Sequence, residues 1–580
     1  MGIWLFCLPS EAPAQSPKHE FRGAWIATVI NLDWPSSGNA STATKQSRLR
    51  GILDDLAATG INSVFFQVRT ECDALYDSPF EPWSVYLTGQ QGRVPDPYFD
   101  PLEFAVEEAH ARGLSLHAWL NPFRCEREVG RYQLDPDHPV VENPEWMLTL
   151  ESSSTPGLRH TILNPGLDAV HEYVDAIVED ILRRYEVDGI HFDDYFYPYP
   201  PYNIGSADVA TFDAQPRGFT DLDDWRRDNI NRFVARIYDT VQEVQPDAVF
   251  GISPFGIWRS GTPPGITGLS GADALYADAV AWLQDGTVDY IAPQLYWPFE
   301  GPQDFAALSE WWAGASQGRH VYPGLAAYRS DPATTSSPFA PSEIPRQIRF
   351  GRSTDGVQGH ILFRTQNLRG TVVGDSVAAQ YTRPAIPPPM DHRDLFPPDP
   401  PDALRATAGI DGTVVLEWDP SIFGFVLARS FAVYRAEGAA PPDPRTMTAS
   451  SEMLIGRAFG PEYTDRPGGS GPYHYVVTAL SGNSAESSET AVVTVTDVTT
   501  GITESPELAE LQVWPNPFRQ GLNIRGAGRV RIYDALGRII WTGDSAGALT
   551  WRQRVPPGLY FVRIESPSGR TATARVIRAR

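Results

Sequence analysis

Two adjacent carboxylates, Asp193 and Asp194, stand between an apolar stretch and an aromatic, proline-rich loop. Residues 189–195 are predicted to form a strand, because Val, Ile and Phe favour a buried pleated surface and the prolines from Pro198 onward stop it. Carboxylates beside aromatic rings are typical of sugar-binding sites. The alternative is that the two Asp only cap a turn, where Asp is common. A pair that follows His191 and precedes several aromatic residues favours a site.

The side chains of this strand should alternate between two faces. Ile190 and Phe192 would share one face, and Gly189, His191 and Asp193 the other. A polar face on an otherwise apolar strand suits the interior of a parallel barrel. The carboxyl end of such a barrel is where enzymes of this architecture carry their chemistry.

The elements that must position this strand follow a regular order of apolar segment, loop and amphipathic helical pattern. Helical spacing of apolar residues predicts helices at Gln46–Thr59, Pro101–Arg112, Leu167–Tyr185 and Asn229–Val244. Strands are predicted at Arg22–Val29, Ser63–Arg69, Ser115–Asn121, Gly189–Tyr195, Phe250–Pro254, Tyr290–Tyr296, Val321–Ala327 and His360–Arg364. Alternating strands and helices indicate an α/β fold with a parallel sheet, and eight strands indicate a closed (β/α)₈ barrel over residues 19–385.

Hydroxyl-binding and ring-stacking side chains gather at the predicted strand ends. These candidate substrate-binding residues are Gln67, Arg69, Asp73, Trp119, Asn121, His191, Tyr195, Gln294, Tyr296 and Trp297. One alternative is that Arg69 only pairs with Asp73 or Glu71. Others are that Trp119 belongs to the core and that His191 is a hydrogen-bonded barrel residue rather than a proton carrier.

Several other chemistries lack their signatures in this sequence. The strand ends carry no His, Asp and Glu at metal-ligand spacing, so no metal and no cofactor are expected. There is no glycine-rich phosphate loop and no Gly-x-Ser-x-Gly turn. The formal net charge of −24 argues against nucleic acid as a partner.

The chain beyond the barrel divides into four predicted segments. Residues 386–401 are a proline-rich linker, and residues 402–497 have the short alternating strands of a β-sandwich. Trp418, Tyr434-Arg435 and Tyr463-Thr464-Asp465 resemble a fibronectin type III domain. Residues 498–510 are a second linker, and residues 511–580 are again all β.

The first residues have the features of an exported chain. The apolar run Ile3–Leu8, followed by small residues, resembles the end of a secretory signal peptide, assigned to residues 1–18. No later apolar run reaches transmembrane length. Cys72 and Cys125 follow the second and third predicted strands, and we expect them to form a disulfide after export.

Six motifs together resemble the glycosyl hydrolase-like family ten over residues 19–385. They are Phe21-Arg22-Gly23-Ala24-Trp25, Gln67-Val68-Arg69, Asp73-Ala74-Leu75-Tyr76, Ala118-Trp119-Leu120-Asn121-Pro122, Gly189 through Tyr195, and Pro293-Gln294-Leu295-Tyr296-Trp297. The resemblance implies hydrolysis of bacterial cell-wall glycan that lacks peptide stems. The chain departs from the family at Glu71-Cys72, where small residues are more usual.

The last segment resembles the C-terminal sorting domain of the type IX secretion system. Three phrases occur in the expected order: Val513 through Phe518, Val530 through Arg538, and Pro557 through Ile564. This resemblance implies export, passage across an outer membrane through the type IX machinery, and a secreted or cell-surface location.

The expected mechanism depends on the number of carboxylates. A typical glycosidase has two on different strands, but the fifth predicted strand ends without a Glu. The adjacent pair instead resembles retaining N-acetylhexosaminidases, in which the acetamido oxygen of the substrate attacks the anomeric carbon. By that resemblance Asp193 orients the acetamide and Asp194 is the acid, with a raised pKa.

The substrate would be held by neighbouring strand ends. Tyr296 would bind the acetamide carbonyl, while Gln67, Arg69 and Asn121 would hold hydroxyls or a lactyl carboxylate. One alternative is a hydrolase of another polysaccharide that uses Asp193 as nucleophile. A third reading is a non-catalytic carbohydrate-binding surface protein.

Overall fold

The computed structural model describes residues 16–393, 396–409, 411–421, 426–469, 471–496, 498, 511–514, 518, 521–534, 538–553, 555–565 and 571–578. Most of the predicted signal peptide and of the predicted linker 498–510 lies outside the described residues. The chain forms two compact units, Met1–Thr499 and Thr500–Arg580.

The first unit is built around a parallel sheet of nine strands. In sheet order they are β10 (His320–Val321), β9 (Tyr290–Ile291), β8 (Val249–Ile252), β7 (Gly189–Phe192), β3 (Ser115–Leu120), β2 (Ser63–Arg69), β1 (Phe21–Ile26), β12 (Gly359–Phe363) and β11 (Gly324–Ala326). The outermost strands, β10 and β11, are consecutive on the chain and separated only by Tyr322 and Pro323. The sheet therefore curls back on itself, consistent with a TIM-barrel-like domain.

All eight predicted strands are present, and the seventh is split into β10 and β11. The strand before the Asp pair ends earlier than predicted, at Phe192 instead of Tyr195. Both of its neighbours end just before a proline, β3 ahead of Pro122 and β8 ahead of Pro254. Proline cannot donate to a ladder, so β7 loses its partners at this point.

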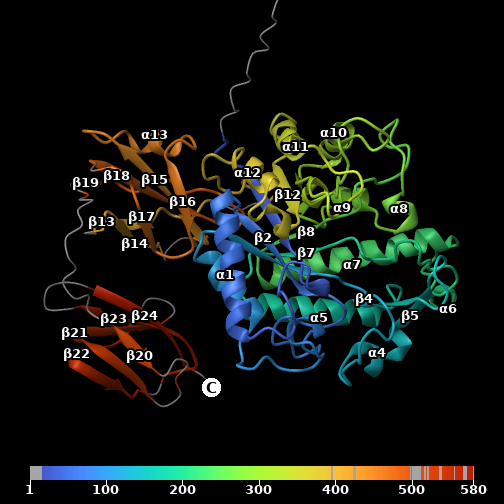
Figure 1. Ribbon diagram of the computed structural model, residues 1–580, viewed down its shortest axis with the longest axis horizontal. Coiled ribbons are helices and arrows are strands. Elements are labelled where there is room, and N and C mark those ends of the chain that lie inside the picture. Colours follow the sequence, from blue (N-terminus) through green and yellow to red (C-terminus); the bar gives the residue numbers. More distant parts are fainter. Residues whose placement is uncertain are drawn as a thin grey trace, which may run out of the picture. The chain divides into compact units, whose positions relative to one another are not determined.

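Helices surround this sheet, and Figure 1 shows α1, α5 and α7 beside it. The longer ones are α1 (Thr42–Thr59), α3 (Pro101–His110), α5 (Asp168–Arg184), α7 (Leu222–Val244), α10 (Phe305–Ala315) and α11 (Glu343–Arg352). The shorter ones are α2 (Val85–Thr88), α4 (Pro139–Glu142), α6 (Val209–Ala214), α8 (Gly271–Ala274), α9 (Ala279–Asp285) and α12 (Val372–Ala378). Helices α1 and α7 begin before their apolar pattern because Ser41 and Asp221 cap them, each accepting hydrogen bonds from backbone N–H groups of the first turn.

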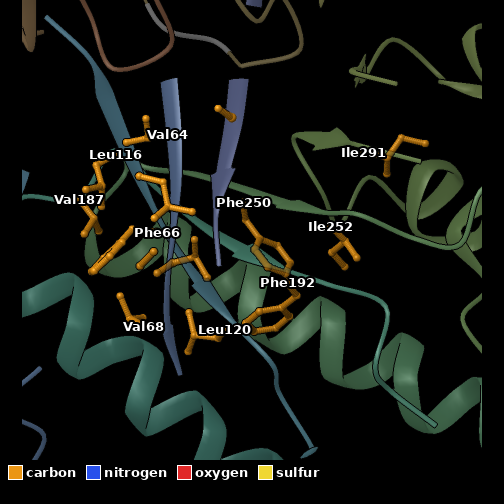
Figure 2. Packing of buried hydrophobic residues seen from close by; sticks show 14 of the residues in the cluster. Val64, Phe66, Val68, Leu116, Leu120, Val187, Phe192, Phe250, Ile252 and Ile291 are labelled. Carbon is orange, nitrogen blue, oxygen red and sulfur yellow. The ribbon is translucent and has the colours of Figure 1, made fainter. Parts of the chain in front are cut away.

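The two faces of the strands build two separate cores. Figure 2 shows the face that packs against the helices, with Val64, Phe66, Leu116, Phe192 and Phe250 among its buried side chains. The opposite face fills the interior with a second cluster that includes Phe21, Trp25, Phe65, Trp119, Tyr290 and Ile361. The alternation predicted for β7 is confirmed, because Ile190 and Phe192 belong to the first core.

A small antiparallel sheet is inserted after β3. Its strands are β4 (Arg124–Glu126), β6 (Arg159–Leu163) and β5 (Met147–Glu151), in that order. Strand β4 thus begins four residues after β3 ends and fixes the loop beside the Asp pair.

The first unit also contains a β-sandwich. One sheet has β13 (Asp402–Ala408), β14 (Val414–Asp419) and β17 (Glu462–Asp465). The other has β16 (Leu454–Ala458), β15 (Ser430–Glu437), β18 (Tyr473–Leu480) and β19 (Val493–Val495), and α13 (Pro444–Thr448) lies between β15 and β16 in the chain. Their shared core includes Leu416, Trp418, Val433, Tyr475 and Val477.

The segment between barrel and sandwich is packed over its first part. Met390 joins the interior core of the barrel, and Ile386 joins a core of the sandwich. Arg393 Nη1 lies 3.1 Å from Oδ2 of Asp289, just before β9, and donates to the carbonyl of Ala248 at 2.8 Å. The prolines therefore lead a segment that closes the amino-terminal end of the barrel.

The second unit is one antiparallel sheet of five strands. They are β20 (Gln512–Trp514), β21 (Leu522–Asp534), β22 (Ile539–Trp551), β23 (Gly558–Glu565) and β24 (Thr571–Arg578), around a core that includes Leu522, Ile524, Ile532 and Val562. Residues 515–517 and 535–537 of the predicted sorting phrases lie outside the described residues. Within the described part of the chain, no helix is both long and apolar enough to cross a membrane.

Candidate active site

A cavity of about 210 Å³ opens at the carboxyl end of the barrel and contains Asp193. Nearly every barrel strand or the loop after it contributes to its wall: Trp25, Gln67, Trp119, Asp193, Ser253, Gln294 and Phe363. Pockets for drug-sized ligands measure about 300–1,000 Å³, so this one suits a single sugar unit. A larger cleft of about 640 Å³, at the amino-terminal end beside the sandwich, has no pair of carboxylates in its wall.

Asp193 is buried and accepts hydrogen bonds from two side chains of the neighbouring strand end. Trp119 Nε1 donates to its Oδ2 at 3.2 Å, and Asn121 Nδ2 donates to the same oxygen. Burial raises the pKa of Asp193 to about 7; the nearby Arg124 guanidinium opposes this rise, and the Asp194 carboxylate adds to it.

Asp194 is equally buried but has different partners. The hydroxyl of Tyr199 donates to its Oδ2, and the side chain of Gln294, which lines the cavity, also hydrogen-bonds it. Burial raises the pKa of Asp194 to about 6 against these two hydrogen bonds. The raised pKa that was predicted for Asp194 is therefore present. Two adjacent carboxyl groups with different neighbours can have different roles in a reaction.

An amide and guanidinium network holds the Asp193 side of the cavity. Gln67 Nε2 donates to Asn121 Oδ1 at 2.7 Å, and Arg124 Nη2 donates to the same oxygen at 2.8 Å. Gln67 also accepts from the backbone N–H groups of Thr28 and Val29, at 2.9 and 3.0 Å. Gln67 and Asn121 thus position Asp193 and the loop after β1.

Besides Trp119, two aromatic residues predicted for binding reach the cavity. Tyr195 is 39% exposed, with the Arg124 guanidinium 4.8 Å from its ring centre. Tyr296 stacks on Phe363 at 5.9 Å between ring centres, and its hydroxyl forms no hydrogen bond with the described residues. Burial raises the pKa of Tyr296 well above its usual range, so the hydroxyl is a donor.

Arg69 is not brought to the cavity. It was a candidate binding residue at the end of the second predicted strand. A regular strand would place it on the same face as Gln67, but the register of β2 against β3 shifts between these residues and places Arg69 opposite Leu120, which packs toward the helices. Arg69 pairs instead with Glu81, through nitrogen–oxygen contacts of 2.6 and 2.8 Å, and both side chains are fully buried. The anticipated alternative partners, Asp73 and Glu71, were therefore also wrong.

Asp73 has a local structural role. Its Oδ1 accepts from the hydroxyl of Thr70 at 2.6 Å and from the N–H of Glu71 at 3.1 Å. It is fully buried and does not line the cavity. Its carboxylate shapes the turn after β2 instead of contacting a ligand in the cavity.

His191 lies inside the barrel below the cavity. Its Nδ1 is 3.0 Å from the hydroxyl of Tyr290, and its Nε2 accepts from Trp25 Nε1 at 3.1 Å. Burial lowers the pKa of His191 well below its usual value, so the ring is neutral. The alternative of a hydrogen-bonded barrel residue describes it best.

Trp297 stands at the rim outside the cavity. Its ring packs edge-on against Phe255, with 5.6 Å between ring centres. Position 256 is Gly, where an added Cβ would lie 2.7 Å from the Trp297 ring. The residue is half-buried and does not line the cavity.

Several residues of the site were missed from the sequence, among them Trp25, Arg124 and Tyr199. Trp25 and Arg124 line the cavity, and Tyr199 hydrogen-bonds Asp194. Trp25 stood within a motif already noted, and Tyr199 within the aromatic loop, so both had a signal. Arg124 had none, because the short strand β4 that carries it has no recognisable pattern.

Comparison with known proteins agrees with this geometry. Residues 20–340, more than half of the chain, match the family "Glycosyl hydrolase-like 10". Glycosyl hydrolase YngK of Bacillus subtilis (strain 168) is 35% identical over 452 residues, which cover 76% of this chain and 87% of that protein. The chain belongs to the glycosyl hydrolase-like 10 family.

Other relatives carry similar names. Glycosyl hydrolase DigH of Escherichia coli (strain K12) is 35% identical over 402 residues, covering 64% of this chain and 89% of that protein. Among solved structures, the PgaB glycoside hydrolase domain of Bordetella bronchiseptica aligns with a TM-score of 0.40 and 15% identity, over 63% of this chain and 98% of that chain. As a member of this family the protein is a glycoside hydrolase.

Two further features of this family member concern metals and thiols. The described residues contain no group of three or more His, Cys, Asp or Glu that could hold a metal ion. Cys72 and Cys125 are buried free thiols whose sulfur atoms lie 2.8 Å apart. The structure therefore brings the predicted pair together without the bond, and the disulfide stays a prediction.

Proposed function

We propose that the enzyme hydrolyses glycosidic bonds in N-acetylated glycan, in the form of peptidoglycan strands that lack peptide stems. The observation that carries this proposal is the adjacent pair Asp193 and Asp194 at the end of β7, with Asp193 in a cavity sized for one sugar unit. Trp25, Trp119 and Tyr296 supply aromatic walls for that unit.

We further propose a substrate-assisted, retaining mechanism. Asp193 is the one carboxylate among the residues that line the cavity, so two carboxylates do not face each other across it. The acetamido oxygen of the substrate then takes the place of the second carboxylate and attacks the anomeric carbon. An oxazolinium ion forms as the bond to the leaving sugar breaks, and water later opens it.

Asp193 and Asp194 have different roles in this mechanism. Asp193, held by Trp119 and Asn121, accepts the acetamide N–H and stabilises its developing positive charge. Asp194, whose pKa is raised by burial to about 6, is the acid that passes a proton to the leaving oxygen. The free hydroxyl of Tyr296 donates to the acetamide oxygen and aligns it for attack.

Paired variants test this division. Asp194→Asn removes the proton donor, so substrates with poor leaving groups should lose about 10²–10⁴-fold in rate while aryl glycosides with good leaving groups lose far less. Asp193→Asn misplaces the acetamide, so the rates of hydrolysis of both substrate types should fall by similar factors. Full activity in both variants would show that the site lies elsewhere.

Trapping experiments separate the mechanism from its rival. A thiazoline mimic of the oxazolinium ion should inhibit the enzyme, and a fluorosugar should leave no adduct. A sugar ester on the peptide containing Asp193, seen by mass spectrometry, would assign Asp193 as nucleophile and leave the hydrolase assignment standing. Binding of glycan without release of reducing ends would instead indicate a carbohydrate-binding protein.

We also propose roles for the remaining segments. The sandwich has three strands in the order β13-β14-β17 and four in the order β16-β15-β18-β19, which supports a fibronectin type III-like domain. The compact all-β second unit supports a type IX sorting domain at residues 511–580. With the signal peptide, this would place the enzyme outside the cell or on its surface.

A further inference from the structure

Arg124 is a buried cation in the cavity wall whose charge lowers the pKa of Asp193, yet none of the described residues forms an ion pair with it. The side chain belongs to β4 and is 5% exposed. Its Nε donates to the carbonyl of Thr70 at 3.1 Å and its Nη2 to the amide oxygen of Asn121 at 2.8 Å. Both acceptors are neutral, and the described residues give this guanidinium neither an ion pair nor a hydrogen bond at Nη1.

The other deeply buried arginine near this site is neutralised. Arg69, on β2, is held by both carboxylate oxygens of Glu81. A charge removed from water without a partner is costly, so buried arginines are normally paired in this way. Arg124 departs from this rule at the one place in the barrel where a ligand is expected.

The surroundings of Arg124 hold it in position but leave one edge available. The ring of Tyr195 covers one face of the guanidinium, with 4.8 Å from the central carbon to the ring centre. Thr70 and Asn121 occupy two of its nitrogens, and Arg124 is the one cationic residue that lines the cavity. A planar guanidinium with a free edge matches a carboxylate group.

We propose that Arg124 is an anion-binding residue of the active site, and that the enzyme recognises a glycan in which a sugar beside the cleaved bond carries a carboxylate. This inference rests on the proposed glycan hydrolase function and assigns the residue that recognises the charged group of its substrate. A peptidoglycan strand without peptides presents such a group, the lactyl carboxylate of its muramic acid units. Chitin has the same acetamido groups but carries no carboxylate.

The test compares two substrates that differ only in this charge. One is a peptide-free peptidoglycan strand, and the other is the same strand with its carboxylates reduced to alcohols. The wild-type enzyme should prefer the charged strand. Arg124→Gln should lower the preference, measured as kcat/KM on the charged strand divided by kcat/KM on the reduced strand, by about 10–100-fold, because a charge-assisted hydrogen bond to the substrate is lost on the charged strand alone. Any loss that comes from the contact of Arg124 with Asn121 acts on both strands and cancels in this ratio. Arg124→Lys, which keeps the charge, should lie between.

A matched control removes an arginine that lies outside the cavity. Arg131 is exposed on the same inserted segment, and Arg131→Gln should leave the preference between the two strands unchanged. This control accounts for any general attraction of an acidic polymer. Thermal unfolding of each variant confirms that equal amounts of folded enzyme are compared.

Two results would overturn the inference. An equal loss on both strands would assign Arg124 to positioning Asn121 and Asp193, and an absence of wild-type preference would remove the carboxylate from recognition. If no glycan is hydrolysed, the proposed function fails separately. Calorimetric binding of the two strands to the Asp194→Asn variant then still measures whether the charged one binds more tightly through Arg124.

Discussion

Arg429 of the β-sandwich lies 3.1 Å, through its Nε, from Oδ1 of Asp188 in the barrel. Asp188 directly precedes β7, the strand whose other end carries the Asp pair. The second oxygen of Asp188 accepts from the N–H of Leu116 at 2.7 Å and lies 2.8 Å from His110 Nε2. A sandwich residue therefore helps to fix the start of β7, and the sandwich is part of the folded enzyme.

Removing this arginine should destabilise the barrel. Arg429→Met leaves Asp188 buried with an incomplete set of partners, which costs about 3–5 kcal/mol for a buried pair. The free energy of unfolding in urea should fall by this order. Arg405→Met is the control, because Arg405 pairs with Asp419 on the exposed surface of the sandwich, where such pairs contribute about 0–1 kcal/mol. Equal losses of unfolding free energy in both variants would contradict the conclusion that Arg429 stabilises the barrel through Asp188.

The C-terminal unit should be dispensable for catalysis. A protein ending near Asp497 keeps the whole first unit, so it should hydrolyse glycan at the full-length rate. The same truncation should stop export past the outer membrane in a host with a type IX system. A protein ending at Ala385 should behave differently, because it lacks Met390 and Arg393 at the amino-terminal end of the barrel. Loss of activity in a folded Asp497 truncation would show that the tail belongs to the enzyme.

A row of aromatic rings leads from the cavity across the rim. Ring centres are 5.4 Å apart for Tyr195 and Tyr199, 6.1 Å for Tyr199 and Phe255, and 5.6 Å for Phe255 and Trp297. We expect sugars beyond the cleaved bond to lie along this row. Trp297→Ala should then lower kcat/KM about 2–10-fold on long glycan and leave short aryl glycosides unaffected.

A tryptophan elsewhere on the barrel provides the control for the ring row. Trp311 of α10 stacks on Trp258 at 5.7 Å between ring centres and is not part of the row. Trp311→Ala should alter stability without changing the ratio of long to short substrate rates. A similar change of this ratio in both variants would remove the row from substrate binding.

The barrel could be predicted from sequence because its signals are local. Strand and helix periodicities follow from which side chains are buried, and every predicted strand of the barrel was found. The helix starts were missed where a capping residue, such as Ser41, begins the helix before the regular spacing of buried apolar residues starts. The ends of β7 and β9 were missed because a strand also depends on its neighbours, which the chain order does not reveal.

The site was predicted in part for the same reason. Gln67, Trp119 and Asp193 converge because alternation holds along their strands up to the cavity. The prediction that Arg69 binds substrate was wrong because one register shift changes the face of the sheet on which a residue lies. Arg124 was missed because a short inserted strand brings it back to the cavity. Both errors arise from non-local pairing, which periodicity does not encode.

The two buried cysteines should be cross-linked in the exported protein. Cys72 follows β2 and Cys125 belongs to β4, and a bond between them would join loops 53 residues apart. Such a cross-link contributes about 2–4 kcal/mol to stability. Thiol labelling of the secreted protein, denatured without reductant, should find neither cysteine reactive, and two labelled cysteines would contradict this. The Cys72→Ser and Cys125→Ser double variant should unfold at the lower temperature of the reduced wild-type protein.

The buried Asp pair should make stability depend on pH. Burial raises the pKa of Asp193 from 3.8 to about 7, so between these values the folded protein holds a proton that the unfolded chain has released. A group with a raised pKa stabilises the fold fully below its unfolded pKa, and this contribution is lost as the pH rises through the folded pKa. A shift of this size corresponds to about 4 kcal/mol as an upper bound.

Asp193→Asn should therefore be more stable than the wild type at pH 8 and similar to it at pH 4. The neutral amide keeps an oxygen for Trp119 and Asn121 to donate to, but it carries no charge to be buried. The difference in melting temperature between variant and wild type should grow from pH 4 to pH 8 and then level off. Asp285→Asn, at the exposed end of α9, should show no such trend. A constant difference across this range would mean that the Asp193 carboxyl titrates at its ordinary pKa in the folded protein.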